Sequence, residues 1–118
     1  MDREWAEVTE EAAEKILETK RNRKRVIAVG TTTTRALESF SDAQGHVEPG
    51  RKEVTLFIYP PYRFKVIDGL ITNFHLPKST LILLVAAFAS KSLIMDAYQE
   101  AVRERYRFYS YGDAMLIL

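Results

Sequence analysis

The sequence predicts an α/β fold, a layered mixed sheet flanked by helices. Segments rich in strand-forming residues alternate along the chain with segments of helical periodicity, which is the pattern of a layered α/β arrangement. Of the 118 residues, 47% are hydrophobic, which is enough to build a core. No repeat, low-complexity tract or linker divides the sequence, so residues 1–118 are expected to form a single α/β domain.

The first part of the chain is expected to form a helix, a strand and a second helix. Thr9 is suited to cap a helix whose apolar stripe contains Ala12, Ala13, Ile16 and Leu17. Val26–Val29 is a short continuous apolar run, which is typical of a buried strand. Gly30 ends that strand, and Thr31–Phe40 has the pattern of a helix that follows it directly.

The middle of the chain is expected to form two strands. Ser41–Arg51 contains two glycines and a proline, which is turn chemistry. Glu53–Tyr59 is rich in strand-forming residues and ends at Pro60 and Pro61. Phe64–Ile71 has the pattern of a second strand, with a break available at its Asp-Gly pair.

The last part is expected to form two helices and a strand. Ser79–Ser90 is apolar on most faces, so this helix should be buried, with Leu81–Phe88 packed against the predicted strands. Ser92 is suited to cap the next helix. One face of that helix carries Ile94, Ala97, Tyr98, Ala101 and Val102. Ala114–Leu118 should close the fold as a strand.

The composition limits the classes of function. Because the chain has no cysteine, it forms no disulfide, no cysteine-ligated zinc site and no thiol nucleophile, which fits a cytoplasmic location. The longest apolar run, Leu81–Ala89, is far shorter than a membrane span, so no membrane contact is expected. No histidine pair has metal-ligand spacing, so we expect neither a metal nor a resident cofactor. The net charge of +1 restricts nucleic-acid contacts to local patches.

A first candidate site is the sequence VIAVGTTTTRALES, Val26–Ser39. A strand, a glycine and a helix N-terminus form a corner that favours an anion, although a single glycine matches no nucleotide-binding fingerprint. Thr31 and Thr32 open the helix, and Arg35, about one turn later, has a guanidinium suited to a carboxylate or phosphate. The alternative is that the threonines only cap the helix and that Arg35 pairs with Glu38 or another acidic neighbour.

A second candidate site is the sequence TNFHLPKST, residues 72–80. It combines an amide, an imidazole, an ammonium group and hydroxyls just before an apolar helix. His75 has the chemistry of a general base near neutral pH, and Lys78 can pair with an anion. Ser79 and Thr80 can cap the first free backbone N–H groups of the helix. The alternative is that His75 is a structural histidine.

Two further segments are rich in positive charge and could bind RNA or phosphate. RERYRFYSYGD, Arg103–Asp113, alternates arginines with aromatic residues, a pattern that can bind single-stranded RNA or can form half-buried core beside a solvated face. Residues 20–25 carry five positive charges in six positions, and we refer to them as the basic connector. The basic connector is either a phosphate-binding patch or a soluble loop.

Three strings in order, VIAVGTTTTRALES, LFIYPPYRFKVIDGLITNFHLPKSTL and YRFYSYGDAMLI, give the chain a family resemblance. It resembles the C-terminal third of the S-adenosylmethionine:tRNA ribosyltransferase-isomerases of queuosine biosynthesis. The resemblance implies transfer and isomerisation of the ribosyl group of S-adenosylmethionine onto 7-aminomethyl-7-deazaguanine in tRNA, giving epoxyqueuosine. It implies S-adenosylmethionine as a co-substrate and tRNA as a partner. The alternative is a non-catalytic fragment or an RNA-binding module with the family fold.

The family chemistry also implies roles for individual residues. His75 is the first candidate for the general base and Asp113 the second. The substrate carboxylate suits Arg35, Lys78 or the helix that follows residue 77. The adenine suits stacking on Phe74 or Tyr111. We expect the candidates of the first two sites to converge on one cleft, namely Thr31, Thr32, Arg35, Asn73, His75 and Lys78. Because the family enzyme is longer, we also expect a homodimer or a missing N-terminal half as partner, and weak or no turnover by this chain alone.

Overall fold

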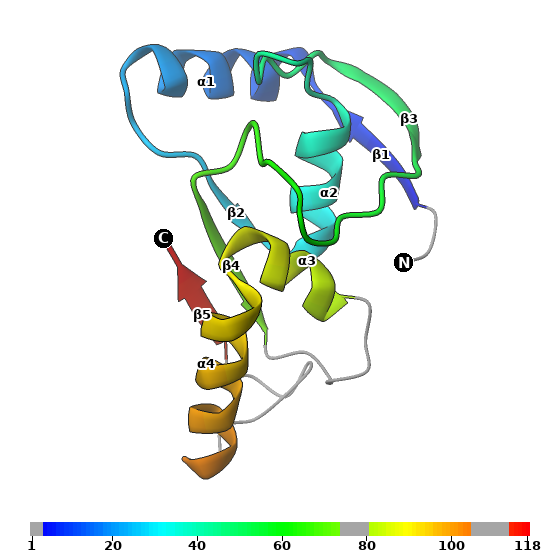
Figure 1. Cartoon of the computed structure of the whole chain (residues 1–118). Coiled ribbons are helices and arrows are strands. Elements are labelled where there is room, and N and C mark those ends of the chain that lie inside the picture. The colour runs from blue at the N-terminus through cyan, green and yellow to red at the C-terminus, as the bar shows by residue number, and fades with distance from the viewer. Residues whose placement is uncertain (1–3, 74–80, 105–113) are drawn as a thin grey trace.

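The computed structural model describes residues 4–73, 81–104 and 114–118, apart from the side chains of residues 91 and 92 (Figure 1). Helices and strands alternate, which confirms the predicted α/β class. The elements are, in order, β1 (Glu4–Val8), α1 (Glu10–Arg21), β2 (Ile27–Val29), α2 (Thr31–Ser39), β3 (Gly50–Val54), β4 (Gly69–Asn73), α3 (Leu81–Phe88), α4 (Lys91–Arg103) and β5 (Ala114–Ile117).

The strands form two separate sheets. A three-stranded mixed sheet has the order β2-β4-β5, with β2 parallel to β4 and β5 antiparallel to it. A two-stranded antiparallel ribbon pairs β1 with β3. Helix α2 contacts both β1 and β3 of the ribbon and β2 of the sheet, so it joins the two sheets into one body (Figure 1).

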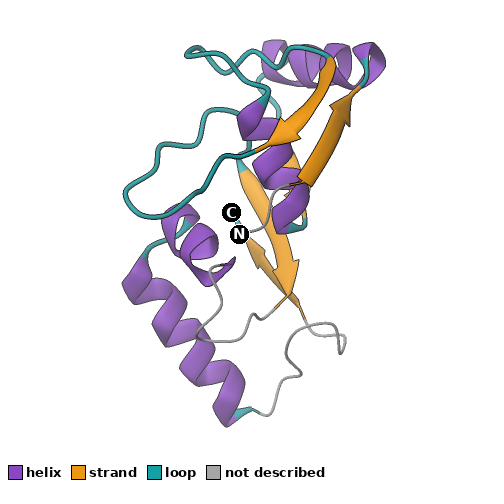
Figure 2. Cartoon of the chain, turned by 90° about the vertical axis from the view of Figure 1, so that its right-hand side faces the viewer, coloured by secondary structure: helices purple, strands orange, loops and turns teal. Residues whose placement is uncertain are grey.

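The main core lies between the three-stranded sheet and helices α3 and α4. Ala28 of β2 and Leu70 of β4 belong to one buried cluster with Leu84 of α3 and Ile94 of α4. Figure 2 shows both helices along one side of these strands. Full burial of one leucine side chain contributes about 1.5 to 3 kcal/mol, so this cluster is the main stabilising layer around the sheet. The predicted packing of Leu81–Phe88 onto the strands is confirmed.

The helix starts agree with the sequence for α1 but not for α4. The Thr9 hydroxyl accepts a hydrogen bond from the Ala12 backbone N–H at 3.1 Å, as predicted. Helix α4 is capped by Ser90, whose hydroxyl accepts from the Leu93 N–H at 3.0 Å. The prediction that Ser92 is the cap was wrong, because α3 already ends at Phe88 and the next helix can begin two residues earlier.

Two strands lie at other residues than predicted, because tertiary contacts decide where they form. The strand predicted over residues 53–59 lies at Gly50–Val54, where it finds a partner in β1; Ile58 is nevertheless fully buried. The strand predicted over residues 64–71 begins only at Gly69. Residues 65–67 cannot join a ladder through their N–H groups, because these groups bind the Glu38 side chain. β1 itself was not predicted.

The burial of β2 also differs from the prediction. Only Ala28 points into the core, whereas Ile27 is 42% exposed and Val29 is 65% exposed. A continuous apolar run predicts a strand buried on both faces, but the described residues cover only one face of β2. Within the described residues no single helix is long and apolar enough to cross a membrane. Helix α3 and residues Leu93–Arg103 together reach that length and hydropathy, but they are bent by 118° at their junction.

Candidate functional site

Described residues from each of the three strings that carry the family resemblance lie at one end of the three-stranded sheet. β2 and β4 are parallel and end at the same edge, where the Gly30 N–H donates to the Ile71 carbonyl at 2.8 Å. β5 is antiparallel, so its first residue, Ala114, lies opposite Asn73, the last residue of β4. We call this end, formed by residues 30–32, 72–73 and 114, the motif edge. In open α/β sheets, ligands bind at the carboxyl ends of parallel strands.

Gly30 gives the motif edge a backbone that other residues do not adopt. Its φ of 95° and ψ of 152° lie in a region that is essentially restricted to glycine. Apart from Gly30 itself and its two chain neighbours, no described residue has an atom within 4 Å of the position that a Cβ at Gly30 would take. Helix α2 begins at the next residue without a side-chain cap at Gly30. The first N–H groups of α2 therefore place the positive end of the helix dipole at the motif edge.

The predicted site residues divide into three groups. Thr31, Thr32 and Asn73 lie at the motif edge; Thr31 is buried, whereas Thr32 and Asn73 are exposed. Arg35 lies further along α2 and is described in the next paragraph. The remaining predicted residues lie outside the described part of the chain, namely Phe74, His75, Lys78, Ser79, Thr80, Tyr111 and Asp113. Their convergence on one cleft stays a prediction.

Arg35 is a buried residue that links α2 to the ribbon. Its side chain is 5% exposed. Its Nε donates to the Leu56 carbonyl at 3.1 Å, and a terminal guanidinium nitrogen donates to Glu4 Oε1 at 3.1 Å. An acidic neighbour was one of the two alternatives from the sequence, and that neighbour is Glu4, not Glu38. The role of Arg35 as a carboxylate ligand stays a prediction.

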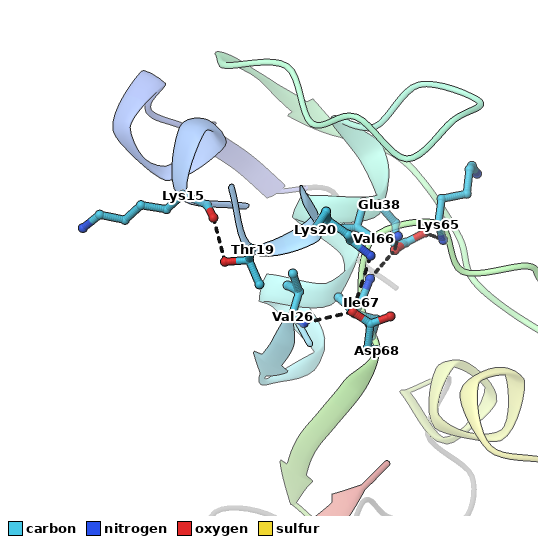
Figure 3. A network of polar contacts seen from close by, with 9 residues as sticks. All are labelled: Lys15, Thr19, Lys20, Val26, Glu38, Lys65, Val66, Ile67 and Asp68. Carbon is cyan, nitrogen blue, oxygen red and sulfur yellow. Dashed lines mark hydrogen bonds and ion pairs between the residues drawn. The ribbon is translucent and has the colours of Figure 1, made fainter. Parts of the chain in front are cut away.

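Glu38 is a buried residue whose importance the sequence did not reveal. Oε1 accepts from the Lys65 N–H at 2.9 Å and from the Tyr62 hydroxyl at 3.1 Å. Oε2 accepts from the Val66 N–H at 2.8 Å and the Ile67 N–H at 3.3 Å (Figure 3). One carboxylate therefore satisfies three successive backbone donors and fixes the chain before β4. The donors lie more than 20 positions downstream, so no local pattern could have identified them.

Asp68 fixes the start of β2 against the start of β4. Its Oδ2 accepts from the Val26 N–H at 2.9 Å and from Lys20 Nζ at 3.4 Å (Figure 3). The Val26 carbonyl in turn accepts from the Asp68 N–H at 2.7 Å. These bonds set the parallel register that places Val29 opposite Ile71, and hence Gly30 at the motif edge.

Tyr62 gives the Glu38 contacts a measurable pH dependence. Burial, followed by the charge of Glu38 and its hydrogen bond, raises the pKa of Tyr62 well above its usual value of 10.0. The unfolded chain releases the phenol proton at a lower pH than the folded chain. The stability that protonated Tyr62 contributes to the fold is therefore fully present below about pH 10. It is lost as the pH rises toward the pKa of Tyr62 in the folded chain.

We therefore expect wild-type protein to lose more stability than Tyr62→Phe between about pH 9 and pH 11. Urea unfolding of both proteins at both pH values measures the difference. Other tyrosines and lysines titrate in both proteins, so their contributions cancel in the comparison. Equal losses would contradict the assignment of the raised pKa to Tyr62.

A cavity formed by the described residues lies away from the motif edge. Its volume is about 830 Å³, between α1 and the loop that precedes β3. Ala13 and Leu17 of α1 face Gly45 and His46 of the loop across this cavity. None of the predicted site residues that the structure describes lines it, and its lining contains both acidic and basic side chains. The described residues of the three strings that carry the family resemblance lie instead at the motif edge. Among the described residues no group of three metal-binding side chains occurs.

Comparison with known proteins gives a family match over nearly the whole chain. The family described as "Queuosine biosynthesis protein" matches residues 1–117. The S-adenosylmethionine:tRNA ribosyltransferase-isomerase of Pelotomaculum thermopropionicum is 62% identical over 118 residues, which are 100% of this chain and 35% of that protein. The protein of the same name from Halothermothrix orenii is 58% identical over the same shares of both chains.

A solved structure carries the same fold. The crystal structure of an S-adenosylmethionine tRNA ribosyltransferase from Thermotoga maritima matches with a TM-score of 0.87 and 52% identity. The match covers 97% of this chain and 40% of that chain. The chain thus spans about a third of the length of the curated relatives it matches. It belongs to the queuosine biosynthesis protein family, and these relatives are S-adenosylmethionine:tRNA ribosyltransferase-isomerases.

Proposed function

We propose that the motif edge is the S-adenosylmethionine-binding part of a tRNA-modifying transferase-isomerase of queuosine biosynthesis. The reaction would transfer and isomerise the ribosyl group of S-adenosylmethionine onto 7-aminomethyl-7-deazaguanine in tRNA. Epoxyqueuosine in tRNA would be the product, and adenine and methionine would be released. As residues 1–118 form a single α/β domain in this proposal, the chain provides one wall of the site, and the rest of the family polypeptide completes it.

The observation that carries this proposal is the pairing of Asn73 with Ala114 beside Gly30. It supports a common site because these residues belong to the three motifs that carry the family resemblance. His75 is two positions from Asn73, and Asp113 is next to Ala114. Both candidate bases are thus within two positions, along the sequence, of residues that pair at one end of the sheet.

The proposed roles follow from the chemistry of S-adenosylmethionine. Its carboxylate would bind the N-terminus of α2, where Gly30 leaves room, or the Lys78 ammonium group. Its adenine would stack on Phe74 or Tyr111, and an aromatic face also suits the sulfonium. His75 would accept protons as the amine of the deazaguanine attacks the ribosyl group, with Asp113 as the alternative base.

The test is adenine release from S-adenosylmethionine in the presence of tRNA carrying 7-aminomethyl-7-deazaguanine. We expect weak or no release by this chain alone, and release when the chain replaces the matching segment of the Pelotomaculum relative. In that longer protein, His75→Ala should reduce release about 100-fold or more if the imidazole is the base. The matched control is His46→Ala, because His46 is the other histidine and its side chain is 63% exposed beside Asp42. Full activity of His75→Ala would contradict the role of His75.

RNA binding without chemistry is the second candidate function, and the basic connector favours it. Arg21, Arg23, Lys24 and Arg25 are all exposed, whereas Lys20 binds Asp68. Phosphate contacts release counterions, so binding to tRNA through these residues would weaken steeply with salt. A gel shift with tRNA over a salt series detects such binding. A tRNA-binding chain that releases no adenine even within the longer protein would support this second function.

A further inference from the structure

One face of the three-stranded sheet is apolar and uncovered by the described residues. The register places Val29, Ile71 and Leu116 in one row across the three strands. Ile27 and Leu118 flank Gly69 in the next row, since a Cβ on Gly69 would meet both side chains at 3.2–3.3 Å. We call these residues, 27, 29, 71, 116 and 118 around Gly69, the open face.

The open face is exposed over most of its width. Val29 is 65% exposed, Leu116 is 58% exposed and Leu118 is 67% exposed. The opposite face of the same strands, with Ala28 and Leu70, is buried under α3 and α4 (Figure 2). A sheet with one solvated face alternates apolar and polar residues, but these strands read IAV, GLITN and AMLI. Such strands are typical of a sheet that is covered on both faces.

The length of the family polypeptide indicates what covers the open face. The Thermotoga structure contains this fold as 40% of its chain, so more than half of that chain lies outside the match. Contiguous exposed apolar patches on soluble proteins mark interaction surfaces. We propose that the open face is the docking surface for an apolar layer from the part of the family polypeptide outside the matched segment. The proposal rests on the family membership and the register, and not on the proposed catalytic activity.

A lysine at Leu116 tests this proposal by comparing two contexts. In this chain alone, Leu116→Lys places its charge in water, and the melting temperature should change by no more than about 2 °C. In the chimera, in which this chain replaces the matching segment of the Pelotomaculum relative, the charge would be buried against an apolar layer. There we expect the melting temperature to fall by about 5 °C or more.

The matched control is Leu93→Lys on α4. Leu93 is 57% exposed and Leu116 is 58% exposed, so the two substitutions start from equal exposure. Leu93→Lys should change the melting temperature by the same amount in the chain alone and in the chimera. An effect of the lysine on secondary-structure propensity would likewise be the same in both. Equal shifts for Leu116→Lys in the two contexts would overturn the proposal, because the open face would then be solvated in the longer protein as well.

A thiol at the same position gives an answer even if the lysine variant does not fold. The chain contains no cysteine, so Leu116→Cys adds a single thiol to it. We expect the alkylation rate at position 116, followed by peptide mass spectrometry, to fall about tenfold or more in the chimera. An unchanged rate would overturn the proposal. Slow alkylation in the chain alone that becomes fast on dilution would also overturn it, because a second copy would then be the occupant of the open face.

Discussion

Replacing Glu38 by alanine is expected to cost about 3 to 5 kcal/mol of unfolding free energy, a large part of the total stability of a small domain. The substitution leaves the N–H groups of residues 65–67 and the Tyr62 hydroxyl without their acceptor. Glu38 is only 3% exposed, so water does not reach these groups easily. Urea unfolding followed by circular dichroism measures the loss.

Two further variants separate this effect from general loss of charge. Glu38→Gln keeps one oxygen acceptor but turns an N–H group toward a backbone N–H, so an intermediate loss of about 1 to 3 kcal/mol is expected. Glu18→Ala on the exposed side of α1 should stay within about 0.5 kcal/mol of wild type. If Glu38→Ala were as stable as Glu18→Ala, the carboxylate would not be holding residues 65–67.

Replacing Arg35 by alanine is expected to cost about 2 to 4 kcal/mol. The change removes the hydrogen bond to the Leu56 backbone carbonyl and the contact with Glu4, and it leaves a gap at the junction of α2 with the ribbon. Arg35→Lys should recover only part of the loss, because an ammonium group lacks the planar fork that reaches both acceptors. Unfolding in urea with and without S-adenosylmethionine measures both roles of Arg35.

The ion pair itself should contribute less than the burial of Arg35. The Glu4 side chain is 43% exposed, so solvent screens its charge. Glu4→Gln is therefore expected to lower stability by no more than about 1 kcal/mol. If Arg35→Ala were as stable as wild type but lost stabilisation by S-adenosylmethionine, Arg35 would serve the ligand and not the fold.

Features set by neighbouring residues were predictable from the sequence. The Thr9 cap and α1 depend on residues within four positions of each other, and their prediction was confirmed. The meeting of the first two motifs at one sheet edge was also expected, because each follows a strand in a parallel arrangement. In the described residues β2 and β4 are parallel, whereas the convergence of the site residues on one cleft stays a prediction.

Features set by distant contacts were not predictable. β1 pairs with β3 some 45 residues later, and the sequence of neither strand indicates which strand it pairs with. β4 begins later than predicted, because the Glu38 carboxylate binds the backbone N–H groups that a strand would have used. The sequence offered Glu38 or another acidic neighbour as the partner of Arg35, and only the fold identifies Glu4. In each case the deciding partner lies far away along the chain.

The most direct test of a shared site at the motif edge is a titration of the ¹⁵N-labelled chain with S-adenosylmethionine, followed by amide chemical shifts. We expect the largest shifts at Gly30, Thr31, Asn73 and Ala114, because these backbone groups surround the proposed ligand. The amides of Gly45 and His46, at the cavity beside α1, should stay unchanged. Shifts centred on Gly45 and His46 would contradict the motif edge as the S-adenosylmethionine site.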